Sequence, residues 1–342
     1  MKSAAARTPR ILASIGASLL TLQFASAALA APIAAEQRQA FQQLREDPAP
    51  EALVRNSHYW VSNENAHDVW RSRIENIGGA LIGVGADQVY VLASWARPEV
   101  LIPMDFDGSI RDIHFAYGAA FLEAADIEAF RAFWNDDAQA RMRDALTRHF
   151  GAAQAEASMA AWDSAHGRIQ RRFRKITDYY NRKNVPTFIN DANTYRRIRT
   201  LWQEGRVFPV RGDATGSVGL RAIARALEAA HIQVGVVYLS NVEQYISYDA
   251  QTRRNFISLP WADNGLMLRT RPMASLGLTG EDCEYHYNVQ LGTNFRQWLS
   301  VNRVPDGTRL LLRNLSRTST PGLSEIVAEP AQSSPPPEIA AP

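Results

Sequence analysis

The sequence predicts an α/β protein with a doubly wound, mostly parallel sheet. Short apolar runs alternate with segments of helical periodicity, and a glycine-rich turn joins the first run to a helix. Strands separated by helices form parallel sheets that are covered on both faces. An apolar fraction of 46% supplies the core of such a fold. The small net charge of +2 gives no support for nucleic-acid binding, for which a basic stripe would be expected, so we expect no nucleic-acid partner.

Apolar runs that end in a turn or a polar cluster are expected to form the parallel strands, at residues 80–84, 100–104, 207–210 and 234–239. A helix is expected at 87–97. A second is expected at 217–230, where apolar side chains recur on one face: Leu220, Ile223, Ala224 and Leu227.

Residues from about 119 to 206 interrupt this alternation and are predicted to be helical almost throughout. We interpret them as a helical insertion with helices at 124–150, 152–181 and 193–204. The second half carries basic side chains that we interpret as the solvated face of an amphipathic helix: Arg168, Arg171, Arg172, Arg174 and Lys175.

The C-terminal third is expected to add antiparallel strands to the sheet. Three apolar segments follow without intervening helices, at 255–259, 266–271 and 285–290. Residues 316–342 are rich in Ser, Thr and Pro and are predicted to be disordered, because they cannot bury enough apolar surface to fold.

The first thirty residues have the pattern of a secretory signal peptide. A basic start precedes a mostly apolar stretch at 11–24, and Ala28-Leu29-Ala30 matches an A-x-A cleavage site. Polar residues within the stretch disfavour the alternative, an uncleaved membrane anchor. We therefore expect an exported, periplasmic protein without a stable membrane span. A helical segment is expected at 31–57 and the main domain at 58–315.

The glycine-rich turn is the strongest local signal for a ligand site. Gly83 and Gly85 end the first strand and Asp87 opens the next helix, whose free N–H groups can bind oxygen atoms. Asp105 follows about twenty positions later at the next strand end, where an acid binds ribose hydroxyls. The third glycine of the dinucleotide pattern is absent, which disfavours a pyrophosphate and leaves a nucleoside ligand such as S-adenosylmethionine. A tight structural turn is the alternative.

Two further strand ends carry polar groups that are expected at the same edge of the sheet. Asp213 follows the third strand and is a candidate ligand-binding residue or a helix cap. Ser240 is a candidate cofactor-binding residue after the fourth strand. Asn241, Glu243 and Tyr245 are candidate catalytic residues, with Glu243 a general base if partly buried. A plain structural loop remains the alternative. Any one of Ser62, Asn63 or Asn65 is expected to cap the helix that follows, and the Ser62-Asn63 motif becomes a candidate site only if the fold brings it to Ser240 and Asn241.

Several of these motifs together resemble a family of uncharacterised bacterial proteins typified by a Leptospira protein with a class I methyltransferase-like Rossmann fold. The resemblance covers roughly residues 58–300 and rests on Ser62-Asn63-Glu64, Gly83-Val84-Gly85, Asp87-Gln88, Tyr90, Arg97-Pro98 and Tyr238-Leu239-Ser240-Asn241-Val242-Glu243-Gln244-Tyr245. It implies the fold directly, and methyl transfer only by analogy of fold.

The leading functional hypothesis is binding of a nucleoside-type ligand, with S-adenosylmethionine as cofactor and methyl transfer to an unknown acceptor. Export conflicts with it, because an exported protein does not normally meet S-adenosylmethionine. A non-enzymatic exported binding or structural protein with a degenerate cofactor site is the first alternative.

A phosphohydrolase is the second alternative. Met104-Asp105-Phe106-Asp107-Gly108-Ser109 is similar to the nucleophile motif of haloacid dehalogenase-like phosphatases, in which Asp105 would attack phosphorus and Asp107 would protonate the leaving group. The order of the remaining motifs fails. That family needs a lysine after its second motif, and no lysine occurs beyond Lys183.

Overall fold

The computed structural model describes residues 34–301, 304 and 306–330, which contain an eight-stranded mixed sheet. The expected signal peptide at 1–30 lies outside the described residues. The strands are β1 (Ala80–Gly83), β2 (Val100–Asp105), β3 (Val210–Arg211), β4 (Val234–Tyr238), β5 (Trp261–Pro272), β6 (Tyr285–Leu291), β7 (Leu315–Arg317) and β8 (Leu323–Ile326). Their order is β3-β2-β1-β4-β5-β6-β8-β7.

The first five strands are parallel, and the strand order reverses between β1 and β4. β6 is antiparallel to β5, β8 is parallel to β6, and β7 is antiparallel to β8. The predicted α/β fold with a mostly parallel sheet and antiparallel C-terminal strands is therefore confirmed, and the arrangement is Rossmann-like. The crevice between β1 and β4 is where such sheets bind ligands.

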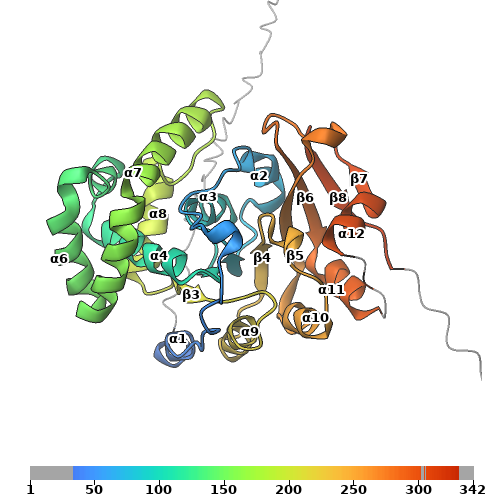
Figure 1. The fold of residues 1–342 in the computed structure, drawn as a ribbon, viewed down its shortest axis with the longest axis horizontal. Helices are drawn as coiled ribbons and strands as arrows, with labels where there is room; N and C mark the ends of the chain where they lie inside the picture. The colour runs from blue at the N-terminus through green and yellow to red at the C-terminus, as the bar shows by residue number, and fades with distance from the viewer. Residues whose placement is uncertain (1–33, 302–303, 305, 331–342) are drawn as a thin grey trace, which may run out of the picture. The chain divides into compact units, whose positions relative to one another are not determined.

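Helices cover the sheet and extend beyond it (Figure 1). They are α1 (Ala35–Gln42), α2 (Arg71–Ile74), α3 (Asp87–Ala96), α4 (Gly108–Glu123), α5 (Ile127–Ala132), α6 (Gln139–Phe150), α7 (Ala152–Arg182), α8 (Ala192–Gln203), α9 (Gly219–Ala229), α10 (Ala250–Ile257), α11 (Gly292–Ser300) and α12 (Gly307–Asn314). Short 3-10 helices lie at Val54–Asn56, His67–Trp70, Asp136–Ala138, Val242–Gln244 and Ala274–Leu276. No helix within the described ranges is long and apolar enough to cross a membrane.

The strand predicted at 207–210 is shorter than expected. Val207 makes only an isolated bridge to Leu101, and β3 proper consists of two residues. Pro209 lies between the bridge and the strand, and proline has no N–H to donate to a sheet ladder. β3 is therefore a short edge strand whose main role is to deliver the following loop to the crevice.

The helical insertion begins later than predicted. Residues 119–123 belong to α4, which starts at Gly108 directly after β2 because Asp107 caps it by accepting the Ser109 N–H at 2.9 Å. α5 to α8 then form the insertion and pack against α4, and α6, α7 and α8 are seen on the left of Figure 1. The predicted solvated face also needs one correction, because Arg172 is buried in α7.

Two C-terminal predictions were wrong and a third holds on one side only. Residues 255–257 lie in α10, which begins at 250 because the Asp249 carboxylate accepts the Thr252 N–H at 2.7 Å. β5, predicted at 266–271 as antiparallel, is antiparallel to β6 but parallel to β4. Residues 315–317 and 323–326 are strands rather than disordered chain, because β8 pairs with β6 and buries Leu323 and Ile326. The part of the predicted tail at 331–342 lies outside the described residues.

Candidate functional site

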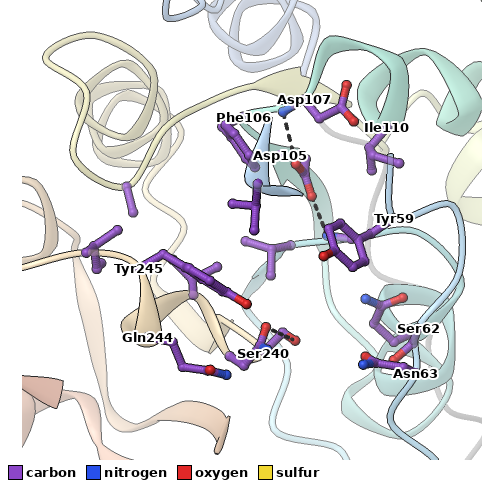
Figure 2. A pocket seen from close by; sticks show the side chains of 18 of the residues that line it. Tyr59, Ser62, Asn63, Asp105, Phe106, Asp107, Ile110, Ser240, Gln244 and Tyr245 are labelled. Atoms are coloured by element: carbon purple, nitrogen blue, oxygen red, sulfur yellow. Dashed lines mark hydrogen bonds between the residues drawn. The ribbon is translucent and has the colours of Figure 1, made fainter. Parts of the chain in front are cut away.

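A cavity of about 450 Å³ opens at the carboxyl ends of β1, β2 and β4, where the strand order reverses. Its volume lies in the range of small-molecule sites. The walls come from segments 54–63, 84–88, 104–110, 212–215 and 240–246, with residues 272 and 284–285 at one side. Figure 2 shows side chains from several of these segments facing the same space. We call this cavity the cleft.

The cleft brings together most of the residues that the sequence singled out. Six line it: Gly85, Asp105, Asp213, Ser240, Asn241 and Tyr245. Three do not: Gly83, Asp87 and Glu243. Ser62 and Asn63 also line the cleft, so the fold does unite the two Ser-Asn motifs. The prediction that they cap a helix was wrong, because the following 3-10 helix has no side-chain cap.

The glycine turn is shaped by its neighbours. Gly85 has a φ of +80°, which favours glycine, and a Cβ there would lie 1.9 Å from Gln88 Nε2 unless that side chain moved. Gly83 serves packing instead, since a Cβ would lie 2.8 Å from the Val89 side chain. The buried Gln88 amide packs against the turn at Gly85, and its Oε1 has no hydrogen-bond partner.

Asp105 lies at the floor of the cleft and holds this turn in place. Its carboxylate accepts the N–H of Gly85 and the N–H of Asp107, both at 3.0 Å. Burial raises the pKa of Asp105 to about 7, and the nearby Asp107 charge adds to the rise, while the two backbone N–H groups oppose it. Near neutral pH this carboxyl therefore exchanges between acceptor-only and donor forms.

His114 supports the turn from the other side. Its Nε2 lies 2.9 Å from the Gly85 carbonyl oxygen, which can only accept, so Nε2 carries the proton. Nδ1 then accepts the Tyr90 hydroxyl at 3.0 Å. Burial lowers the pKa of His114 to about 4, which keeps the ring neutral.

Asp87 is a structural residue rather than a ligand-binding one. Its carboxylate is fully buried, forms an ion pair with Arg172 Nε at 2.8 Å and accepts the Ser62 N–H at 2.9 Å. Arg172 also donates to the Glu64 carbonyl oxygen at 2.9 Å. Desolvation lowers and the Asp87 charge raises the pKa of Arg172, with a net rise. The pair joins α7 of the insertion to α3 and to segment 62–64.

Glu243 was the expected general base, and the structure contradicts this. Its buried carboxylate faces away from the cleft, toward Arg269 Nε at 3.3 Å and the Tyr248 hydroxyl, which donates to it. Gly307 packs directly against the Glu243 side chain. The 3-10 helix at Val242–Gln244 turns this side chain inward, while the neighbours Asn241 and Tyr245 remain on the cleft wall.

Glu64 is the residue that sequence reasoning missed most clearly. Its fully buried carboxylate accepts four side-chain donors: Ser240 Oγ, Thr270 Oγ1 at 2.6 Å, Tyr238 OH at 2.6 Å and His67 Nε2 at 3.1 Å. Burial opposes ionisation, yet these donors hold the pKa of Glu64 below its ordinary value. Its place within Ser62-Asn63-Glu64 was the only signal in the sequence.

Glu64 also explains the backbone of the cleft wall. Ser240 has a φ of +51°, an unusual conformation for a residue with a side chain, and its hydroxyl bonds to Glu64. The Thr270 N–H donates to the Ser240 carbonyl oxygen at 2.8 Å. Side-chain and backbone bonds together therefore fix Ser240 and Asn241 at the cleft.

The remaining lining gives the cleft its chemical character. Carboxyl side chains outnumber the guanidinium by four to one among its lining residues: Asp105, Asp107, Asp213 and Glu284 against Arg55. Two half-exposed tyrosines, Tyr59 and Tyr245, present their rings to the cleft (Figure 2). At the edge, His58 Nδ1 lies 2.6 Å from the Asp107 carboxylate.

A metal site is not evident in the part of the chain that the structure describes. It contains no group of three or more His, Cys, Asp or Glu side chains placed to hold an ion.

Comparison with known proteins places the chain in one family. A family model described as "Domain of unknown function (DUF7790)" matches residues 59–327, which is most of the chain, and the protein belongs to that family. No curated protein matches the sequence. The match spans the segments that form the cleft from Tyr59 onward.

Proposed function

We propose that the cleft binds a nucleoside-type small molecule, with S-adenosylmethionine as the first ligand to test. The observation that carries the proposal is the contact between the Gly85 turn and the Asp105 carboxylate at the switch point of the sheet. An acid at this strand end is placed to accept hydrogen bonds from ribose hydroxyls. Each carboxylate oxygen can accept further bonds beyond its backbone N–H.

The charges that line the cleft favour a neutral or cationic ligand. The four carboxyl groups outnumber the one guanidinium, so the lining would on balance repel a phosphate and attract a sulfonium or an amine. This disfavours a dinucleotide. It also disfavours the phosphohydrolase alternative with Asp105 and Asp107, because a phosphoryl substrate needs several cationic partners.

The aromatic side chains support a planar group in the ligand. Tyr59 and Tyr245 line the cleft and are 46% and 50% exposed to solvent. Flat rings on the wall of a pocket are suited to stacking on a base. Asn241 and Gln244 supply amide groups beside Tyr245 that can read the polar edge of such a ring.

Methyl transfer is the reaction that we propose for this site. Since Glu243 is withdrawn from the cleft, Tyr245 and Asn241 are the candidate catalytic residues that can position an acceptor. S-adenosylmethionine would supply the methyl group. The alternative of a binding protein without catalysis predicts binding and no turnover.

The proposed site can be tested by calorimetric titration with S-adenosylmethionine, S-adenosylhomocysteine, adenosine and AMP. We expect the first three to bind and AMP to bind more weakly, because its phosphate meets the carboxyl groups. Asp105→Ala should weaken binding by about tenfold or more, the loss of one or two hydrogen bonds to a charged acceptor. Asp263→Asn, an exposed carboxyl on β5 outside the cleft, is the matched control.

Two outcomes would contradict the proposal. One is the absence of binding by any of the three nucleosides at millimolar concentration. The other is an equal loss of affinity in Asp105→Ala and Asp263→Asn. Binding of S-adenosylmethionine without transfer to any acceptor would favour the non-enzymatic alternative.

We also propose that the protein is exported, on the basis of the basic, apolar and A-x-A segments at the start of the sequence. A fusion of residues 1–60 to a reporter that is active only outside the cytoplasm tests this, with a 31–60 fusion as control. Mass spectrometry of small molecules released from protein purified from its native compartment then tests whether an exported protein meets the proposed ligand.

A further inference from the structure

Residues 212–219, here called the β3–α9 loop, form one wall of the cleft, yet their conformation depends on a carboxylate from far away in the chain. Gly212, Asp213, Ala214 and Thr215 line the cleft. Asp213 itself is occupied locally, since its carboxylate accepts the N–H and the hydroxyl of Thr215, both at 2.8 Å. It therefore does not cap α9, and neither does any side chain within the loop.

The cap of α9 comes from Asp47. Its carboxylate accepts three backbone N–H groups of the loop: Asp213 at 3.0 Å, Val218 at 2.9 Å and Gly219 at 3.0 Å. The side chain is 2% exposed, so the charge is almost completely removed from water. Three converging N–H groups at a helix N-terminus are the arrangement with which proteins bind anions.

Two glycines of the loop leave room for the Asp47 carboxylate. A Cβ at Gly216 would lie 2.4 Å from Asp47 Oδ1, and a Cβ at Gly219 would lie 2.6 Å from Asp47 Oδ2. On the opposite side, Asn255 Nδ2 donates to the carbonyl oxygens of Ala214 at 2.8 Å and Gly216 at 2.7 Å. The loop is therefore held by an acceptor on one side and a donor on the other.

The residue before Asp47 strengthens the attachment. Glu46 accepts the Arg211 N–H at 2.9 Å and forms an ion pair with Arg111 of α4 at 2.7 Å. Arg211 Nε donates to the Asp47 carbonyl oxygen at 2.8 Å. The family match begins only at residue 59, so this anchor lies outside the matched domain.

We infer that the β3–α9 loop is an anion-binding loop whose ligand is the chain's own Asp47, and that Asp47 is a positioning residue for the wall of the cleft. The segment before residue 59 then helps to position one wall of the cleft. A small free carboxylate such as formate has the chemistry to replace Asp47 in a variant that lacks it. The consequence for ligand affinity rests on the proposed function, whereas the anion-binding loop itself does not.

The test compares Asp47→Gly, which leaves space for formate, with Asp47→Asn and with Glu51→Gln. Glu51 is an exposed acid four residues along the same segment and is the matched control for charge. Amide hydrogen exchange of residues 212–219 should accelerate by at least about tenfold in Asp47→Gly and less in Asp47→Asn, which keeps one acceptor oxygen. Glu51→Gln should exchange as the wild type does.

Formate provides the decisive arm. Sodium formate should slow exchange and raise the melting temperature of Asp47→Gly in a saturable way, while equimolar sodium chloride should not, and neither salt should do so for the wild type. Equal responses to formate and chloride, or unchanged exchange in both Asp47 variants, would overturn the inference. Asp47→Asn provides the same exchange test should Asp47→Gly not fold.

A titration with S-adenosylhomocysteine separates this inference from the proposed function. If the wild type binds it, Asp47→Gly should bind about tenfold more weakly and regain affinity in formate, which a general loss of stability would not produce. Undiminished affinity in Asp47→Gly would overturn the positioning role. If the wild type does not bind it, the proposed function fails, and the exchange and formate results still decide whether Asp47 is the ligand of the loop.

Discussion

Two carboxyl groups beside the cleft, the partly exposed Asp105 and the fully buried Glu64, have pKa values shifted in opposite directions. Asp105, at the end of β2, has a pKa raised to about 7 because burial outweighs its two backbone donors. Glu64, behind the wall formed by Ser240, has a lowered pKa because four side-chain donors outweigh complete burial. The number and kind of donors, rather than depth, therefore decide which carboxyl is structural and which remains available to a ligand.

The largest expected effect is on the Glu64 side. Glu64→Ala removes the acceptor from four buried donors and should lower the free energy of unfolding by about 3–5 kcal/mol. Urea denaturation measures this, and Glu156→Gln at an exposed position of α7 should stay within about 0.5 kcal/mol of the wild type.

A second variant, Glu64→Gln, tests how the carboxylate of Glu64 makes stability depend on pH. Because the folded pKa of Glu64 lies below its ordinary value of 4.5, its contribution is present above that value and is lost as the pH falls below it. Glu64→Gln should therefore lose less stability than the wild type on acidification. Identical acid limbs would show that Glu64 is not held ionised.

Gly85→Ala is the next largest change and acts on the Asp105 side. It places a side chain at a φ of +80° and against Gln88, so we expect a loss of about 2–3 kcal/mol in unfolding free energy. Gly277→Ala is a close control, with a φ of +62° in the left-handed region and no atom within 4 Å of the added Cβ. It should lose only about 1–2 kcal/mol. Equal losses in the two variants would mean that Gln88 moves aside freely.

Asp105→Asn should act in the opposite direction. A folded pKa of about 7 against an ordinary value of 3.8 means that ionisation disfavours the folded state, so wild-type stability falls as the pH rises from 3.8 to about 7 and then levels off. The wild type should lose about 1–2 kcal/mol over this range, a value reduced for partial exposure, and the asparagine variant should lack this decline. A wild-type profile that is flat over this range would contradict the raised pKa.

The smallest effect on stability is expected at Tyr245, which is proposed to contact the ligand and bonds to neither of the two carboxyl groups. Tyr245→Ala removes a ring that is 50% exposed and should change the unfolding free energy by less than about 0.5 kcal/mol. The affinity of the Tyr245→Ala protein for adenosine, measured by titration, should nevertheless fall by about fivefold or more, because one aromatic stacking contact is lost. Unchanged affinity would remove Tyr245 from the site.

How far the sequence could predict the site is clear from individual residues. Gly85 and Asp105 were found because a strand–turn–helix pattern fixes the spacing of a glycine turn and the next strand end. Glu243 was placed wrongly because a single 3-10 turn decides whether a side chain faces the cleft or Arg269, and no periodicity marks that choice. Glu64 and Asp47 escaped notice because all the hydrogen-bond donors to their carboxylates except His67 lie more than 160 residues away in the chain.

The same limit applied to the fold. Periodic apolar runs predicted β1, β2, β4 and α3, since alternation and helical repeats are local properties of the chain. They did not predict that α10 would replace a strand or that β7 and β8 would join the sheet. β7 and β8 are each stabilised by the strand with which they pair, and the residues of a strand do not show which strand that will be.

The sequence by itself thus determined the class of sheet, the glycine turn and the edge at which polar groups gather, because each follows from short-range pattern and strand direction. Only the tertiary structure decided which carboxylates are occupied by the protein itself. Asp87, Glu64 and Asp47 are satisfied by distant donors, whereas Asp105 stays open to the cleft. The energy of a buried charge depends on every donor around it, and those donors come together only when the chain has folded.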